Sequence, residues 1–254
     1  STAAKCIMLK DGQEIVAKSL IDVGAGTSGP QRAIDAVLEN AGMKKEDMAF
    51  TLATGYGRNS LMNFADKQMS ELSCHARGAY FLFPDVHTVI DIGGQDIKAI
   101  SIDENGAVKN FLMNDKCAAG TGRFLEMMAR TLGLSLEEMS TRGLEWKENV
   151  VISSMCTVFA ESEVVSLVAQ NKDVADIIHG LNVSVASKVG ALAARLGKKN
   201  PGEYMMTGGV AKNKGIIQAL EEKLGAKLYI CDEAQLCGAL GAALFAYEKC
   251  NAAL

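Results

Sequence analysis

The chain has 254 residues, enough for one large domain or two small ones with a sizeable buried core. Hydrophobic residues make up 48% of the sequence, charged residues make up 22%, and the formal net charge is −4. This balance gives no attraction to nucleic acid or to anionic membranes, so neither is an expected partner. No apolar stretch approaches the roughly 20 residues that span a bilayer, and no signal pattern opens the chain, which predicts a cytoplasmic protein.

Two stretches far apart in the sequence repeat one pattern, an apolar strand, a tight turn and a second apolar strand. The first copy covers residues 4–17 with its turn at Asp11-Gly12, and the second covers residues 97–112 with its turn at Asn105-Gly106. Asp-Gly and Asn-Gly favour hairpins because both residue types tolerate positive φ. Helix-like and further strand-like segments follow each copy, so the sequence predicts an α/β protein with two related halves.

The two copies differ in what precedes them. A buried-type strand at residues 88–92 and a glycine turn at residues 93–95 come before the second hairpin. The first hairpin has no such strand in front of it, because the sequence begins at Ser1, where the turn would be. By the internal symmetry, we expect the sequence to lack one strand and half a turn at its start.

Helices are predicted where apolar residues recur every three to four positions. Pro30 suits the first position of a helix, and Ser135 with Glu138 forms the signature of a capping box. The small residues at 238–243 predict close packing between helices. The predicted helices cover residues 31–40, 66–76, 124–132, a short segment after Ser135, 174–196, 214–224 and 238–249, and further strand-like segments lie at 150–152, 204–206 and 228–230.

The turn at residues 91–96 has the sequence Asp-Ile-Gly-Gly-Gln-Asp. Its glycines let the backbone approach an anion, and exposed N–H groups there can hold a phosphate. An acidic residue beside such a turn, here Asp91, can orient a hydrated Mg²⁺. The amide of Gln95 can reach a terminal phosphate, which makes it a candidate sensor of hydrolysis. A plain hairpin turn is the alternative interpretation of this segment.

A second glycine turn, at residues 207–213, separates a predicted strand from a predicted helix. The dipole and the free N–H groups of a helix N-terminus favour anions. Together, the repeat and the two turns indicate a nucleotide held in a cleft between two lobes, the plan shared by actin, sugar kinases and the Hsp70 ATPases. We expect ATP or ADP with Mg²⁺ to contact Ser1, Thr2, Ala3, Ala4, Lys5, Gly94, Gln95, Thr207, Gly208, Gly209, Val210, Ala211 and Asn213.

Seven cysteines without paired spacing do not form the framework of a secreted disulfide protein. Cys117 lies just ahead of the helix predicted at residues 124–132, and Cys156 lies ahead of a helix that begins near Phe159. At the start of a helix the dipole lowers the pKa of a thiol. An iron–sulfur cluster usually needs four thiolates, so two per chain suffice only if a two-fold axis supplies two more. A buried small hydrophobe is the alternative role for each cysteine.

The remaining candidate ligands are weaker. Five cysteines follow no recognised ligand spacing, and the three histidines lack a zinc-type partner three to five residues away, so we expect them to be structural or surface residues. These residues are Cys6, Cys74, Cys231, Cys237, Cys250, His75, His87 and His179.

Six segments resemble the signatures of the 2-hydroxyacyl-CoA dehydratase activators, which belong to the BadF/BadG/BcrA/BcrD-type ATPases. The resemblance covers the whole chain and is strongest to members that serve (R)-2-hydroxyglutaryl-CoA dehydratase. The two cysteine motifs are long and specific. The six segments are residues 53–58, 67–76, 91–96, 114–124, 156–163 and 207–213.

This resemblance implies a homodimer with the acetate and sugar kinase/Hsp70/actin fold, which is ribonuclease H-like with duplicated subdomains. It implies one oxygen-sensitive 4Fe–4S cluster between the subunits, held by Cys117 and Cys156 of each chain. It also implies an electron taken from ferredoxin or flavodoxin and passed, with ATP hydrolysis, to a dehydratase of amino-acid fermentation. In that dehydratase the electron makes a ketyl radical from the acyl-CoA.

The resemblance implies two regions, residues 1–113 with both phosphate hairpins and residues 114–254 with the cluster ligands and the later nucleotide turn. Family members carry a Gly-Ile-Asp-Val-Gly segment ahead of the Ser1–Lys5 stretch, and its Asp would help position the metal and the attacking water. We expect Asp91 and Gln95 to be the catalytic residues within this sequence.

Three alternatives stay open. The chain could be the ATPase subunit of a benzoyl-CoA-reductase-type enzyme. It could also be a sugar or acyl kinase of the same fold, which would give no role to Cys117 and Cys156. The third alternative is a nucleotide-dependent scaffold without catalytic activity.

Overall fold

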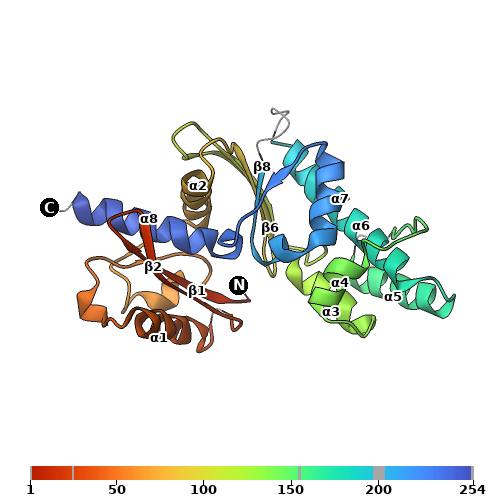
Figure 1. Ribbon diagram of the computed structural model, residues 1–254, viewed down its shortest axis with the longest axis horizontal. Helices are drawn as coiled ribbons and strands as arrows, with labels where there is room; N and C mark the ends of the chain where they lie inside the picture. The colour runs from red at the N-terminus through yellow and green to blue at the C-terminus, as the bar shows by residue number, and fades with distance from the viewer. Residues whose placement is uncertain (1, 25, 154–155, 197–203, 253–254) are drawn as a thin grey trace. The chain divides into compact units, whose positions relative to one another are not determined.

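The computed structural model describes residues 2–24, 26–153, 156–196 and 204–252. Its residues group into two compact units that are each built from separate parts of the chain (Figure 1). Unit 1 comprises Ser1–Val89, Ile100–Asn110 and Cys231–Leu254, and unit 2 comprises Ile90–Ala99 and Phe111–Ile230. The functional division into residues 1–113 and 114–254 stays a prediction.

Unit 1 opens with the first predicted hairpin. Strands β1 (Ala4–Lys10) and β2 (Glu14–Ile21) pair antiparallel, with a register shift between Met8 and Leu9. Asp11 and Gly12 have φ values of 54° and 71°, the left-handed backbone that an Asp-Gly turn was predicted to adopt. The hairpin prediction is therefore confirmed.

Helix α1 (Gly29–Ala41) covers this hairpin, with Pro30 in its first turn as predicted. Its buried face includes Ile34 and Val37, and the hydroxyl of Ser19 on β2 donates a 2.6 Å hydrogen bond to the carbonyl of Ala33. The helix ends at Gly42, whose φ of 64° lets the chain turn away.

The segment between α1 and the next helix holds a short parallel pair, β3 (Leu52–Ala53) and β4 (Lys67–Gln68), with η1 (Lys45–Asp47) and η2 (Arg58–Leu61). The helix predicted at residues 66–76 is wrong at its start, because α2 spans Glu71–Leu82. The Asp66 carboxylate accepts hydrogen bonds from the Thr51 N–H and hydroxyl at 2.6 and 2.7 Å, which holds that segment beside β3.

Helices α2 and α8 (Cys237–Asn251) lie side by side in unit 1 (Figure 1). A Cβ added to Gly241 would lie 1.7 Å from the Cys74 carbonyl oxygen, and one added to Gly78 would lie 2.2 Å from the Cys237 carbonyl oxygen. The two backbones approach each other this closely only because both positions are glycine. The predicted close packing at residues 238–243 is confirmed.

The largest sheet has five strands in the order β7-β6-β5-β8-β9. Every residue of β5 and β6 is buried, and β8 pairs parallel with β9. The turn between β6 and β7 contains Gly106 with a φ of 75°, so the second predicted hairpin is confirmed. The strands are β5 (Thr88–Ile92), β6 (Ile97–Ile102), β7 (Val108–Asn114), β8 (Tyr204–Thr207) and β9 (Leu228–Tyr229).

The helices of unit 2 are α3 (Gly122–Thr131), α4 (Leu136–Arg142), α5 (Thr157–Ala169), α6 (Val174–Ala194) and α7 (Lys214–Leu224), and unit 1 also contains the short η4 (Ala234–Leu236). The capping box at the start of α4 is confirmed. The Glu138 N–H donates to the Ser135 hydroxyl at 3.1 Å, and the Ser135 N–H donates to the Glu138 carboxylate at 2.8 Å.

The predicted strand at residues 150–152 is not formed. Val150 and Ile152 are buried, but their segment packs against α6 instead of pairing with a strand. A Cβ on Gly180 of α6 would lie 2.4 Å from the Val150 carbonyl oxygen, which shows how closely the segment passes the helix. Its apolar residues pack against a helix, and a short apolar run has the same sequence pattern whether it forms a buried strand or a buried loop.

Helix α6 corrects the expectation that no apolar stretch approaches 20 residues. It has 21 residues and is long and apolar enough to cross a membrane by length and composition. More than half of its most apolar window, 56%, is buried inside the protein, and α4, α5 and α7 contact it. Its hydropathy is that of a core helix.

Candidate functional site

A buried ionic network lies at the junction of β5, β6 and β8 in unit 2. The ammonium of Lys98 lies 3.2 Å from the Asp91 carboxylate and 2.8 Å from the Asp96 carboxylate, and all three side chains are at most 4% exposed. The hydroxyl of Thr207 donates a 2.9 Å hydrogen bond to the other carboxylate oxygen of Asp91. Lys98 thus pairs with both carboxylates, and such pairing offsets the cost of burying charged groups.

This network joins the two predicted glycine turns. Asp91 ends β5 and Thr207 ends β8, the neighbouring strand of the sheet. Gly208 has a φ of 88°, and a Cβ on it would lie 2.3 Å from the Ile92 carbonyl oxygen and 2.9 Å from the Asp91 carboxylate. Only glycine therefore fits this position, and the structure brings the predicted Asp91, Thr207 and Gly208 together.

The turn at residues 93–95 rests on the first turn of α3. The Gly93 carbonyl accepts from the Gly122 N–H at 2.9 Å, and the Gly94 carbonyl accepts from the Arg123 N–H at 3.0 Å. A Cβ on Gly122 would lie 3.2 Å from the Gly94 Cα. The turn and the helix N-terminus therefore form one hydrogen-bonded unit, and the side chain of Gln95 is exposed at its tip.

The second turn continues through η3 (Gly209–Lys212) into α7. Val210 and Ala211 are buried and Gly209 is exposed, so only part of this turn faces solvent. The side chain of Asn213 caps α7 by accepting from the Ile216 N–H at 3.0 Å. The Lys214 N–H donates to the Ser140 hydroxyl at 2.9 Å, which occupies another N–H of this helix end.

The other predicted nucleotide contacts belong to unit 1. Thr2 and Ala3 precede β1, and Ala4 and Lys5 begin it. The ammonium of Lys5 lies 3.5 Å from the Ala3 carbonyl oxygen. Ser1 lies outside the described residues.

The two predicted cluster ligands both lie in unit 2. Cys156 is exposed and is the N-cap residue of α5. Cys117 is half-buried in the loop between β7 and α3, where the side-chain amide of Asn114 donates to its carbonyl at 3.1 Å. Both cysteines precede a helix as predicted, but only Cys156 is an N-cap residue, because Thr121 is the N-cap of α3.

The surroundings of Cys117 include a cation that the sequence did not indicate. The ammonium of Lys188 on α6 lies 3.5 Å from the Cys117 sulfur. The stem of Lys188 passes Gly120, whose φ is 86° and whose added Cβ would lie 3.6 Å from the lysine Cδ. A thiolate at position 117 therefore faces a positive charge.

The residues present supply part of the ligand set that a 4Fe–4S cluster takes. The two thiols of unit 2 are not fully buried, and thiolates are the usual ligands of a 4Fe–4S cluster. One chain offers two such ligands and a cluster usually takes four.

All five other cysteines belong to unit 1. Cys74 and Cys237 are fully buried at the α2–α8 contact. Burial raises the pKa of the Cys74 thiol to about 11 and raises that of Cys6 to about 11 as well. A thiol with such a pKa is not prepared to bind metal as a thiolate at neutral pH.

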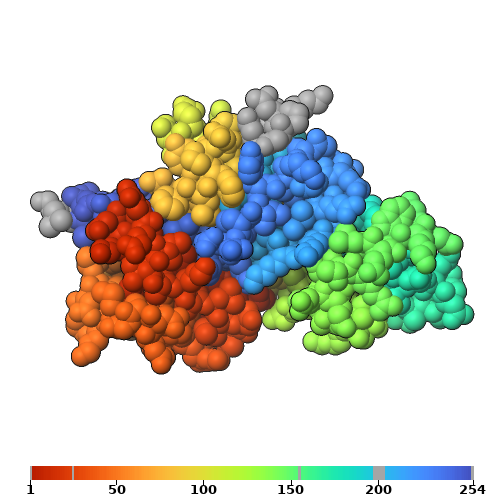
Figure 2. All heavy atoms as spheres, viewed as in Figure 1, coloured from red at the N-terminus to blue at the C-terminus, as the bar shows by residue number. Residues whose placement is uncertain are grey.

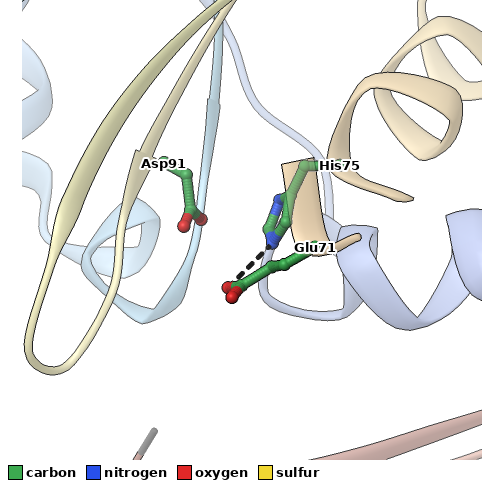
Figure 3. Close-up of side chains that lie close together, drawn as sticks. All are labelled: Glu71, His75 and Asp91. Atoms are coloured by element: carbon green, nitrogen blue, oxygen red, sulfur yellow. Dashed lines mark ion pairs between the residues drawn. The ribbon is translucent and has the colours of Figure 1, made fainter. Parts of the chain in front are cut away.

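His75 and His179 each lie close to neighbouring residues. The Nε2 atom of His75, in α2, lies 3.8 Å from the carboxylate of Glu71 one turn away (Figure 3). An added Cβ on Gly238 would lie 2.8 Å from the same Nε2 atom. The ring of His179 stacks on Trp146 with centroids 3.9 Å apart.

An apolar surface follows Cys156 along α5. Val158 and Phe159 are 64% and 67% exposed, and Val165 and Val168 continue the exposed apolar surface of the same helix. Helices α3, α4 and α5, green to teal in Figure 2, lie at the molecular surface. So large an exposed apolar area on one helix is typical of an interaction surface.

The sequence matches the BadF/BadG/BcrA/BcrD ATPase family over residues 1–246. The chain is 62% identical to the (R)-2-hydroxyglutaryl-CoA dehydratase activating ATPase of Acidaminococcus fermentans, covering 98% of this chain and 95% of that protein. It superposes with a TM-score of 0.95 on the activator of the 2-hydroxyisocaproyl-CoA dehydratase from Clostridium difficile with bound ADPNP, at 46% identity over 100% of this chain and 93% of the other.

A ROK family glucokinase from Streptomyces griseus is 13% identical, with a TM-score of 0.53 over 97% of this chain and 99% of that one. This likeness concerns the fold alone and confirms the predicted actin/Hsp70/sugar kinase type. From the match over nearly its whole length, we conclude that the chain belongs to the BadF/BadG/BcrA/BcrD ATPase family.

Proposed function

We propose that this chain is an ATP-dependent activator of a 2-hydroxyacyl-CoA dehydratase, most closely of the (R)-2-hydroxyglutaryl-CoA type. The observation that carries the proposal is the 62% identity, over nearly the full length, to a protein with that activity. Cys117 and Cys156 both belong to unit 2, which also contains both glycine turns, and neither thiol is fully buried; this supports the proposal.

The nucleotide side of the proposal uses the two glycine turns. ATP or ADP with Mg²⁺ would contact Ser1–Lys5, Gly94, Gln95 and residues 207–213. The Asp91–Lys98–Thr207 network supports this by holding the ends of β5 and β8 at fixed positions. Gln95, exposed at the tip of its turn, is free of the packing that constrains its neighbours and is the proposed sensor of the terminal phosphate.

The redox side uses Cys117 and Cys156 from each of two chains. When bound, a 4Fe–4S cluster supplies one-electron transfer, with ferredoxin or flavodoxin as the proposed donor. The exposed Val158 and Phe159, next to the Cys156 N-cap, support a homodimer interface beside the ligands. Burial of that surface would exclude water from the paired cysteine sites.

The hydrogen bonds between the turn at residues 93–95 and α3 support a mechanical connection between the proposed nucleotide site and the loop of Cys117. The loop that carries Cys117 ends at α3, so a displacement of Gly93 or Gly94 would move the end of that loop. Hydrogen bonding and exposure of the sulfur atoms tune the potential of a cluster, so small movements there matter.

The direct test is activation of a purified (R)-2-hydroxyglutaryl-CoA dehydratase under anaerobic conditions with ATP, Mg²⁺ and dithionite. We expect dehydration of the acyl-CoA only when this chain and ATP are both present. Activation that proceeds equally without ATP would contradict the proposal, and so would ATP-dependent phosphorylation of a sugar by this chain.

A single substitution in the second glycine turn tests nucleotide binding without disturbing the fold. Gly209 is exposed and lies outside the left-handed backbone region, so Gly209→Val is expected to fold. A branched side chain there would block the approach of a phosphate to the backbone, and we expect ADP affinity measured by calorimetry to fall at least tenfold. Unchanged affinity would remove this turn from the nucleotide site.

A further inference from the structure

The side chain of Lys188 reaches the sulfur of a proposed cluster ligand from a distant part of the chain. Its ammonium lies 3.5 Å from the Cys117 sulfur, across a sequence separation of 71 residues. Lys188 is half-buried on α6, between the fully buried Val185 and Val189. Its position is therefore fixed by the core helix of unit 2.

The loop that carries Cys117 also lies against the Lys188 side chain. Gly120 adopts a φ of 86°, and a side chain there would approach the Lys188 stem at 3.6 Å and the Ile97 side chain at 3.3 Å. The hydroxyl of Thr121 donates to the Ala118 carbonyl at 2.6 Å, which tightens the same loop. The lysine stem therefore runs within van der Waals reach of this loop, and the positive φ favours glycine at position 120.

Another lysine close to Cys117 in sequence behaves differently. The Lys116 side chain is 88% exposed and lies 3.5 Å from the carboxylate of Asp115. Water and that carboxylate screen its charge, whereas the ammonium of Lys188 is directed at the sulfur. The two lysines form a matched pair for experiment.

We propose that Lys188 is a positioning residue that donates an N–H···S hydrogen bond to Cys117 and raises the reduction potential of the bound cluster. The inference rests on the proposed function, because it assumes that Cys117 ligates the cluster. Reduction adds one negative charge to a cluster with thiolate ligands. A cation and a hydrogen bond at the sulfur stabilise that added charge, which favours the reduced form.

The test is the midpoint potential of the cluster in anaerobically prepared full-length dimer, followed by electron paramagnetic resonance. For Lys188→Met we expect at least a tenfold fall in the equilibrium constant for reduction, which is a midpoint about 59 mV more negative. Lys188→Arg keeps the charge and donor and should retain most of the wild-type potential. Lys116→Met should shift the potential much less.

An unchanged potential in Lys188→Met, or an equal shift in Lys116→Met, would overturn the proposal. A second measurement covers the case in which Lys188→Met loses its cluster. In wild-type protein with ¹⁵N-labelled lysine, pulsed resonance of the reduced cluster should show a ¹⁵N coupling, and its absence would also overturn the proposal. If the proposed function itself were wrong, the result would differ, because wild-type protein would then contain no iron or sulfide.

Discussion

The two cysteines at the α2–α8 contact of unit 1 and the two cysteines of unit 2 lie in different surroundings. The five of unit 1 include Cys74 and Cys237, which are fully buried where α2 and α8 touch. In unit 2, Cys117 is half-buried in the loop before α3, and Cys156 is exposed as the N-cap residue of α5. A thiol in the first setting acts as a small hydrophobe, and a thiol in the second can act as a ligand.

The largest expected effect comes from removing the ligands of unit 2. Cys117→Ala and Cys156→Ala should each abolish cluster binding, because each change would remove two of the four ligands of the proposed shared cluster. Cys250→Ala, in unit 1, is the matched control and should keep the cluster. Iron and sulfide analysis measures this, and a full cluster in either unit 2 variant would contradict the proposed ligand assignment.

The packing role of unit 1 is tested by Gly241→Ala. The new Cβ would lie 1.7 Å from the Cys74 carbonyl oxygen, so α2 and α8 must separate. We expect the free energy of unfolding to fall by about 3 kcal/mol or more, as for severe overpacking. Gly42→Ala is the control, since a Cβ there meets nothing and the cost of its φ of 64° is about 1–2 kcal/mol. Equal losses in denaturant titrations would show that the contact is not tight.

The alkylation rates of one cysteine from each unit can be compared in a single experiment. In cluster-free protein at pH 8, iodoacetamide should modify Cys156 much faster than Cys74. Burial raises the pKa of Cys74 from 9.0 to about 11, which lowers its thiolate fraction about 100-fold before access is considered. Mass spectrometry of modified peptides over time gives both rates, and comparable rates would contradict the burial of the α2–α8 contact.

The smallest effect is a pH dependence of stability. Because the folded pKa of Cys74 is raised, the unfolded chain loses this proton first as the pH rises from 9 to 11. The unfolded state is then favoured, and the contribution of Cys74 to stability falls with rising pH by up to about 2.7 kcal/mol. The stability difference between wild type and Cys74→Ala should therefore narrow over that range. A constant difference in unfolding free energy would rule out the raised pKa.

Local patterns made much of the fold predictable. The Asp11-Gly12 and Asn105-Gly106 turns, the capping box at Ser135 and the start of α7 all depend on neighbouring residues, and the structure confirms them. The start of α2 was not predictable in this way. A helical period alone cannot show that Asp66 is held by Thr51, fifteen residues earlier.

The candidate site was predictable in its glycines and cysteines but not in its lysines. Glycine turns and cysteine motifs are visible in sequence because few other residues can serve there. Lys98 lies within β6, and a lysine in a strand usually indicates an exposed face. Only the fold brings it between Asp91 and Asp96, and only the fold brings Lys188 to Cys117.

The central claim is a single cluster shared by two chains, and its stoichiometry is the most direct measurement. Anaerobically purified wild-type protein should elute as a dimer in size-exclusion chromatography with light scattering. Four irons shared by two chains give an expected two irons and two sulfides per chain. Four irons per chain, or a cluster that stays with a monomer, would contradict the account.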